Sequence, residues 1–128
     1  MGTRILLIED EDVVRKIVER MLVRAGYGVS CAKDGSVGLE LFNRVRPDLV
    51  VTDIIMPEKE GIEVIRYVRR HAPSTRIIAM SGGGILRTMD VLSYALKLGA
   101  DFALRKPFQL DELLGAVRTA LEPTGLRQ

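Results

Sequence analysis

The feature that most constrains the fold is a strict alternation of short apolar runs with segments whose apolar residues recur at helical spacing. Such an alternation builds a parallel sheet with helices on both faces, because the crossover connections are right-handed. The first four runs are continuously apolar, as expected of strands that are buried on both faces. The pattern therefore predicts a doubly wound α/β fold. The expected strands are 4–9, 27–32, 48–53, 76–80 and 100–105, and the expected helices are 12–26, 35–45, 61–72, 86–99 and 110–123.

The length of the chain and its lack of any linker-like segment indicate one domain. Its 128 residues fit a single domain with a substantial core, and they contain no internal repeat, low-complexity stretch or linker. We therefore expect one domain over 1–128, with its core at about 4–122. No apolar stretch is long enough for a signal peptide or a membrane span, so we expect a cytoplasmic protein without a membrane partner.

The composition argues against several classes of function. The formal net charge is only +2, with 19 basic and 17 acidic residues, so no strong field favours direct nucleic-acid binding. Cys31 is the only cysteine, which provides neither a disulfide framework nor a zinc site. His71 is the only histidine and falls at a predicted helix end, so a Ser-His-Asp or Cys-His catalytic system is poorly supported.

Polar residues stand at the ends of four of the predicted strands, at the edge of a doubly wound sheet where ligands bind. Each has an unremarkable alternative: acids at a helix N-terminus, a turn or cap residue, or a solvated lysine. Taken together, they are hard to attribute to local preferences, and they predict a shared pocket. The residues are Glu9, Asp10, Asp53, Ser81 and Lys106.

This combination of side chains has a chemical logic. Clustered carboxylates repel one another unless a cation joins them, and oxygen ligands with room for water suit Mg²⁺. Asp53 is then placed to act as a nucleophile on phosphorus and to form an aspartyl phosphate. Lys106 would neutralise the phosphoryl oxygens, and the Ser81 hydroxyl would donate a hydrogen bond to one of them.

Four segments carry a resemblance to a known family: "LLIEDE", "DLVVTDIIMPEKEG", "IIAMSG" and "LRKPF", in this order. Over roughly residues 4–122, the chain resembles the receiver domain of bacterial two-component response regulators. The resemblance implies a flavodoxin-like, five-stranded parallel sheet in the order 2-1-3-4-5. It further implies a stand-alone, chemotaxis-type regulator that catalyses only its own phosphorylation and dephosphorylation, although a receiver taken from a longer regulator or hybrid kinase would look the same.

The resemblance also implies roles and partners. A histidine kinase or a histidine phosphotransfer protein would supply the phosphoryl group, and a downstream protein would contact the surface formed by the fourth helix, fifth strand and fifth helix. The Lys106–Pro107 peptide bond is typically cis in this family. The implied site comprises Asp53 as phosphoacceptor and Mg²⁺ ligand, Asp10 as a direct ligand, Glu9 as a ligand through water, the backbone carbonyl of Ile55 as a further ligand, Ser81 as switch hydroxyl, and Lys106 as the conserved-type lysine.

One position departs from the family pattern. The family usually has Tyr or Phe three residues before the lysine, and this chain has Ala103 there. Alanine cannot act as a rotating aromatic switch, and strand alternation should direct the adjacent Phe102 to the other face. We therefore expect phosphorylation to shift or order residues 82–90, where a glycine run makes the backbone permissive.

Three rival functions remain open at this stage. The first is a receiver-like protein-binding module that is never phosphorylated, which the intact Asp53, Asp10 and Lys106 argue against. The second is a Mg²⁺-dependent phosphatase of the haloacid dehalogenase type, which would need an aspartate where Ile55 stands. The third is flavin binding, which the absence of a phosphate loop after the first strand disfavours.

Overall fold

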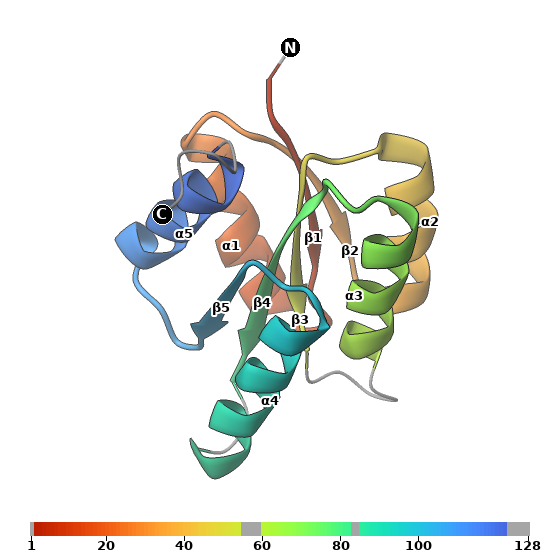
Figure 1. Cartoon of the computed structure of the whole chain (residues 1–128). Helices are drawn as coiled ribbons and strands as arrows, with labels where there is room; N and C mark the ends of the chain where they lie inside the picture. Colours follow the sequence, from red (N-terminus) through yellow and green to blue (C-terminus); the bar gives the residue numbers. More distant parts are fainter. Residues whose placement is uncertain (1, 55–59, 83–84, 123–128) are drawn as a thin grey trace.

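The protein, seen here in a computed structural model that describes residues 2–54, 60–82 and 85–122, folds around one parallel sheet (Figure 1). The strand order is β2-β1-β3-β4-β5, which confirms the predicted doubly wound sheet and its order. The register pairs Leu7 with Cys31 on one side and with Val51 on the other. The strands are β1 (Arg4–Ile8), β2 (Gly28–Ala32), β3 (Leu49–Asp53), β4 (Arg76–Ser81) and β5 (Phe102–Arg105).

Helices cover both faces of the sheet (Figure 1). On one face, α1 and α5 bury a cluster that includes Val18, Leu22 and Leu113. On the other, α2, α3 and α4 bury a cluster that includes Phe42 and Ile65. The first four strands therefore contribute apolar side chains in both directions, as their continuous apolar runs predict. The helices are α1 (Asp12–Arg24), α2 (Gly35–Val45), α3 (Glu60–His71), α4 (Ile85–Leu98) and α5 (Leu110–Leu121).

The buried stripe of α1 differs from the one that the spacing suggests. Leu22 is fully buried, whereas Ile17, which shares the helical spacing of Val14, Val18 and Met21, keeps 49 % of its surface exposed. Ile17 is exposed because it lines a hollow between α1 and the segment after β5 instead of packing against the sheet. Spacing along a helix identifies an apolar face but does not reveal which part of it the neighbouring elements cover.

Glycines terminate two helices as expected. Gly26 follows α1 with φ of 99°, and Gly99 follows α4 with φ of 124°. Both values lie in the left-handed region, where a Cβ atom is costly. At Gly99 the space is closed as well, because a Cβ atom would lie 2.5 Å from Cγ of Arg69.

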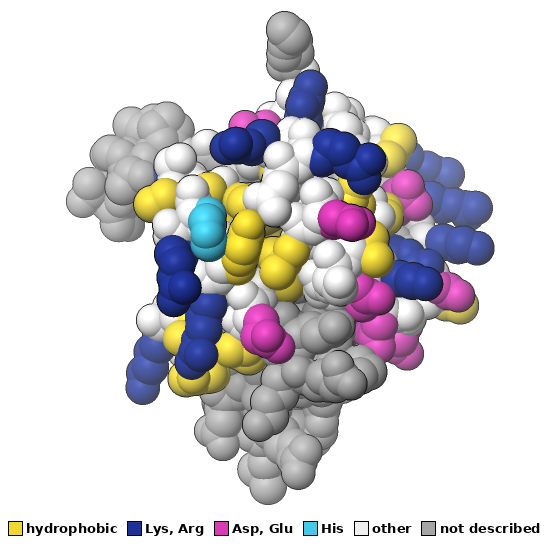
Figure 2. Space-filling view, turned by 90° about the vertical axis from the view of Figure 1, so that its right-hand side faces the viewer, with side chains coloured by type: hydrophobic (Ala, Val, Ile, Leu, Met, Phe, Trp, Pro, Cys, Tyr) yellow, Lys and Arg dark blue, Asp and Glu magenta, His cyan; other side chains and the backbone are white. Residues whose placement is uncertain are grey.

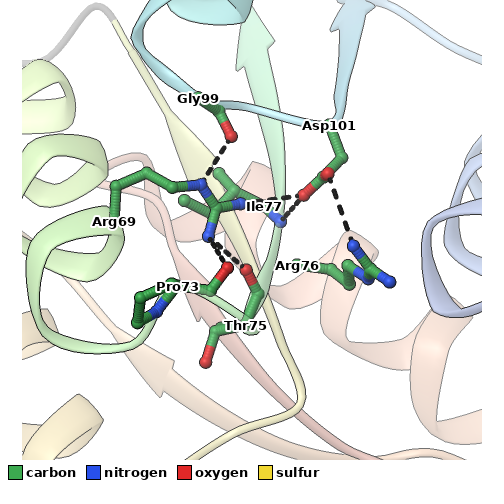
Figure 3. Close-up of polar contacts among 7 residues, drawn as sticks. All are labelled: Arg69, Pro73, Thr75, Arg76, Ile77, Gly99 and Asp101. Atoms are coloured by element: carbon green, nitrogen blue, oxygen red, sulfur yellow. Dashed lines mark hydrogen bonds and ion pairs between the residues drawn. The ribbon is translucent and has the colours of Figure 1, made fainter. Parts of the chain in front are cut away.

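Arg69 connects three segments at the edge of the sheet where the strands begin (Figure 3). From the last turn of α3, its Nε donates to the carbonyl oxygen of Gly99 at 2.9 Å. Its Nη1 donates to the carbonyl oxygens of Pro73 and Thr75, at 3.1 Å and 2.6 Å. Its Nη2 pairs with Oδ2 of Asp101 at 3.0 Å. One guanidinium group therefore holds the loop before β4 and the loop before β5 against α3.

The face formed by α2 and α3 carries a mixture of side-chain types. Lys and Arg side chains lie mainly toward its margins, and hydrophobic side chains lie near its centre (Figure 2). His71 is exposed there and stacks on Tyr67 with ring centroids 4.0 Å apart. Its Nδ1 lies 2.9 Å from the carbonyl oxygen of Tyr67. These contacts give the only histidine a local structural environment far from the acidic side chains at the other edge of the sheet.

Cys31 is expected to react slowly with thiol reagents. Burial, reinforced by the nearby Glu19 carboxylate, raises the pKa of its thiol to about 11, well above the usual value for cysteine. Since the thiolate is the nucleophile, the rate of modification at pH 8 should be about 100-fold below that of a free cysteine. A colorimetric thiol assay in buffer and in urea checks this, and equal rates in both conditions would contradict it.

Among the described residues, every helix is too short or too polar to cross a lipid bilayer.

Candidate functional site

The strands of the parallel sheet end at one edge (Figure 1), and the polar residues predicted at the strand ends lie at that edge. Asp53 is the last residue of β3, and Ser81 is the last residue of β4. Glu9 follows β1 directly, and its backbone N–H extends the pairing by donating to the carbonyl oxygen of Ala32. Lys106 follows β5 in the same way, donating from its backbone to the carbonyl oxygen of Ser81. Because parallel strands end on the same side, residues up to 97 positions apart converge.

Lys106 lies between two buried carboxylates. Its Nζ is 2.6 Å from Oε1 of Glu9 and 3.0 Å from Oδ2 of Asp53. Burial alone would lower the pKa of the Lys106 ammonium group, but the hydrogen bonds and charges of Glu9 and Asp53 outweigh this and raise the pKa above its usual value. The side chain is therefore a fixed cation directly beside Asp53.

Three carboxylates form a potential cation site. Oxygen atoms of Glu9, Asp10 and Asp53 all lie within 4.8 Å of one another. Glu9 and Asp53 are buried, whereas Asp10 is exposed and open to water. An all-oxygen donor set with space for water ligands fits Mg²⁺, which retains several waters when it binds to proteins. The cluster therefore fits the ion that the resemblance implies.

The Glu9 carboxyl group is in an electrostatically strained position. Its burial raises its pKa, and the charge of Asp53 raises it further, while the hydrogen bond from Lys106 lowers it in part. The backbone N–H of Glu11 donates to Oε2 of Glu9 at 3.1 Å. An additional divalent cation at this position would relieve the repulsion between the two buried carboxylates.

Sequence reasoning missed Arg15, which supports this corner of the site. Its Nη1 donates to the carbonyl oxygen of Glu9 at 2.9 Å, and its Nη2 pairs with Asp12. The spacing of Asp12 and Arg15 on a helix predicts their ion pair. Nothing in the local sequence indicates the contact with Glu9, because that contact depends on how α1 packs against β1.

The Ser81 hydroxyl is buried and lacks a hydrogen-bond partner among the described atoms. A buried hydroxyl without a partner is uncommon and generally marks a functional position or an absent ligand. It lies at the end of β4, the strand next to β3 and its terminal Asp53. A ligand oxygen placed over Asp53 would give this hydroxyl an acceptor.

Close packing holds the loop side of β3 in position. A Cβ atom on Gly61, in the first turn of α3, would lie 2.6 Å from Cα of Ile54. Only glycine permits this approach of α3 to the end of β3. The backbone of Ile54, directly after Asp53, therefore packs closely against the start of α3.

Ile55, whose backbone carbonyl is a predicted metal ligand, lies outside the described residues. Ala103 lies in β5 beside Ala79 of β4. Its neighbours Phe102 and Leu104 both pack against the cluster under α1 and α5, which agrees with the expected alternation of side chains.

A groove of about 640 Å³ opens beside the carboxylates, and its apolar wall was not predicted from the sequence. Asp10, Asp53 and Lys106 lie at its polar end. The wall comes from one side of α1 and from the segment after β5, and it comprises Val14, Ile17, Val18, Met21, Pro107 and Phe108. The Lys106–Pro107 peptide bond at its margin is cis, as expected.

Comparison with known families gives a direct match. The response regulator receiver domain family matches residues 5–118 of the chain. The chain belongs to this family. Receiver domains are signalling modules of two-component systems, in which phosphorylation and Mg²⁺ binding at an acidic pocket are typical. The fold, the order of the strands and the acidic cluster of this receiver domain agree with that membership.

Solved receiver structures resemble this one over nearly the whole chain. A response regulator receiver domain protein from Clostridium thermocellum matches with a TM-score of 0.86 at 30% identity, covering 93% of this chain and 94% of that one. A CheY-like receiver domain protein from Methanospirillum hungatei JF-1 also gives 0.86, at 26% identity and with 94% of each chain covered.

Curated relatives are longer than this receiver domain. It is 36% identical to the regulatory protein AtoC of Escherichia coli (strain K12), with 98% of this chain but only 26% of the relative covered. It is 39% identical to the response regulator MprA of Mycobacterium sp. (strain KMS), covering 97% of this chain and 53% of the relative. The chain thus spans about a quarter to about half the length of these relatives.

Proposed function

We propose that this receiver domain accepts a phosphoryl group on Asp53, in a Mg²⁺-dependent reaction, from the phosphohistidine of a histidine kinase or histidine phosphotransfer protein. The observation that carries the proposal is the position of Lys106, whose Nζ lies 3.0 Å from Oδ2 of Asp53 and 2.6 Å from Oε1 of Glu9. A fixed cation beside a nucleophilic carboxylate is what phosphoryl transfer requires, since positioning and charge neutralisation supply most of the catalysis.

The residues divide the work of the reaction among them. A carboxylate oxygen of Asp53 forms the new bond to phosphorus while the bond from phosphorus to the donor nitrogen breaks. Lys106 neutralises charge on the phosphoryl oxygens, and the buried Ser81 hydroxyl donates to one of them. Glu9, Asp10 and Asp53, with the carbonyl of Ile55 as a further predicted ligand, would hold Mg²⁺, which would screen the charges of the dianionic group and the carboxylates.

The central test is the mass of the intact protein after incubation with acetyl phosphate and Mg²⁺. We expect the wild type to gain one phosphoryl group and Asp53→Asn to gain none, since the amide is a poor nucleophile. Asp111→Asn is the matched control, because Asp111 is exposed on α5 and should leave the adduct unchanged. An adduct that persists in Asp53→Asn would refute the proposed role of Asp53.

The main alternative is a receiver-like module that binds proteins but is never phosphorylated. The same experiment decides between the two functions, because such a module would give no adduct in any variant. The proposal of a phosphorylated receiver is supported by the buried contact of Lys106 with both carboxylates and by the Ser81 hydroxyl, which has no hydrogen-bond partner among the described residues. A purely structural module has no need to retain these costly buried groups.

We infer that the output is a protein contact or a phosphoryl relay in the cytoplasm, with no activity on other substrates and no direct nucleic-acid contact. Apolar side chains are exposed on α4: Tyr94 at 45% and Leu96 at 46%. Exposed apolar side chains that lie close together are typical of protein-binding surfaces. They support the α4 part of the predicted contact surface on α4, β5 and α5.

The route from Asp53 to that surface should not pass through position 103. Ala103 has no side-chain rotamer to change, so we expect the backbone of residues 82–90 to respond instead; part of that segment lies outside the described residues. Beryllofluoride, which mimics the phosphoryl group, should therefore shift the amide resonances of residues 82–90 in an NMR spectrum. Unchanged resonances in this segment, with beryllofluoride bound, would contradict the expectation.

A further inference from the structure

The groove beside the carboxylates has two chemically different ends. Asp10, Asp53 and Lys106 form its polar end, and side chains of α1 form its apolar wall. Its volume of about 640 Å³ falls within the range of small-molecule sites. Such sites combine an apolar lining with a few polar groups that orient the ligand, and this groove has both in one continuous space.

The apolar wall is exposed to solvent in the free protein. Ile17 keeps 49% of its surface exposed, and Val14, Met21 and Phe108 are half-buried. A second hollow shares Ile17 and Met21 with the first and continues the apolar surface toward Leu114. An apolar strip that begins at a reactive carboxylate is suited to a ligand with a charged head and an apolar tail.

We propose that the groove binds the acyl chain of a medium-chain acyl phosphate, whose phosphoryl group is transferred to Asp53. This inference rests on the proposed function, because it assumes that Asp53 is the phosphoacceptor. It goes further by assigning the apolar wall on α1 to the leaving group of a small-molecule donor. The groove runs without a break from Asp53 to the apolar wall. A ligand whose phosphoryl group lies at Asp53 would therefore place an attached acyl chain against that wall.

The reaction balances without any additional reagent. A carboxylate oxygen of Asp53 forms a bond to phosphorus, and the bond between phosphorus and the bridging acyl oxygen breaks. The electron pair of that bond leaves with the oxygen, so the product is a fatty carboxylate that needs no proton. Lys106 remains paired with the transferred group, and the acidic residues at the polar end repel the departing carboxylate.

The length of the groove suggests which acyl chains fit. An α-helix rises 1.5 Å per residue, so Ile17 lies about 8 Å along the axis of α1 from its first residue, Asp12. An extended chain of roughly six carbons spans this distance, whereas an acetyl group ends before it reaches Ile17. Chain length is therefore the variable that the experiment should change.

The test compares acetyl phosphate with hexanoyl phosphate, measuring the rate constant per donor concentration for the Asp53-dependent adduct by intact mass. A fully buried methylene is worth about fourfold in binding, and a groove open on one side should give about twofold for each. We therefore expect hexanoyl phosphate to react roughly tenfold faster than acetyl phosphate. Ile17→Ser should reduce this preference about threefold, because it removes part of the apolar wall. Val23→Ser, at another exposed apolar position of α1, should retain it.

A second measurement detects binding without transfer. The hexanoyl analogue in which a methylene replaces the bridging oxygen cannot transfer its phosphoryl group, and it should shift the methyl resonance of Met21 more than the acetyl analogue does. If acetyl phosphate labels Asp53 but hexanoyl phosphate is no faster and the Met21 resonance is unmoved, this inference is wrong while the proposed function stands. If neither donor labels Asp53, both fail.

Discussion

Replacing Lys106 with Met is expected to lower the rate of Asp53 phosphorylation by acetyl phosphate about 100-fold. Lys106 places a positive charge 3.0 Å from Oδ2 of Asp53, where charge develops on the transferred group. Removal of one preorganised donor from such a site costs about two to three orders of magnitude in rate in other enzymes. Methionine retains the apolar length of the side chain, so the loss reports on the charge.

The same substitution should alter the pH dependence of stability in the absence of metal. Burial and the charge of Asp53 raise the pKa of Glu9, and the hydrogen bond from Lys106 lowers it. Without that bond the pKa rises further, so the folded variant favours the protonated Glu9 more strongly than the wild type does. A raised folded-state pKa contributes stability that is lost as pH rises through it. The loss of stability caused by Lys106→Met should therefore be larger at pH 7 than at pH 5.

Arg105→Met is the matched control for both measurements. Arg105 precedes Lys106 in the chain, but its side chain is exposed and makes no contact with the carboxylates among the described residues. Initial rates follow from intact mass over time, and stability follows from urea unfolding in the presence of EDTA. Equal rates for Lys106→Met and Arg105→Met would rule out the assigned role of Lys106.

Replacing Arg69 with Ala is expected to destabilise the fold by about 3 kcal/mol. The substitution removes the donors to Gly99, Pro73 and Thr75 and leaves Asp101 without its closest cation. The side chains of Arg69 and Asp101 are 22% and 16% exposed, so solvent compensates for part of the loss and a value at the low end of the buried-pair range is appropriate. Asp101 would retain the backbone N–H of Ile77 and the more distant Arg76.

Urea unfolding of two further variants isolates this effect. Arg70→Ala removes an exposed neighbour on the same helix and should change the free energy of unfolding by less than about 0.5 kcal/mol. Arg69→Lys should recover only part of the loss, because an ammonium group cannot reproduce the planar fork that reaches several acceptors at once. If Arg69→Ala proves as stable as Arg70→Ala, the network in Figure 3 contributes little to the fold.

Local patterns were sufficient to predict most of the architecture. The apolar runs predicted every strand of the sheet, and the glycines after α1 and α4 adopt the positive φ values that their positions suggested. The convergence of Glu9, Asp53 and Lys106 also followed, because parallel strands end at one edge. This inference needs only the order of elements, which alternation determines.

Features that depend on packing between distant elements could not be predicted in this way. Ile17 has the spacing of a core residue, yet it lines a groove because none of the described elements covers that part of α1. Arg69 looks like one of several arginines on a solvated helix, and its acceptors lie in loops that the sequence does not connect to it. In both cases the deciding information is the angle and position of one helix relative to the sheet.

The two ends of β4 differ in function: one belongs to the Arg69 network that stabilises the fold, and the other belongs to the carboxylate site. Arg76 begins the strand beside Asp101 and the Arg69 network, and Ser81 ends it beside the carboxylates. Six residues of strand separate these ends by about 17 Å. Substitutions that far apart usually have additive effects, so Arg69→Ala and Lys106→Met should not compound each other. Substitutions at the Arg69 edge of the sheet can therefore change the stability of the fold without changing the reactivity of Asp53 at the other edge.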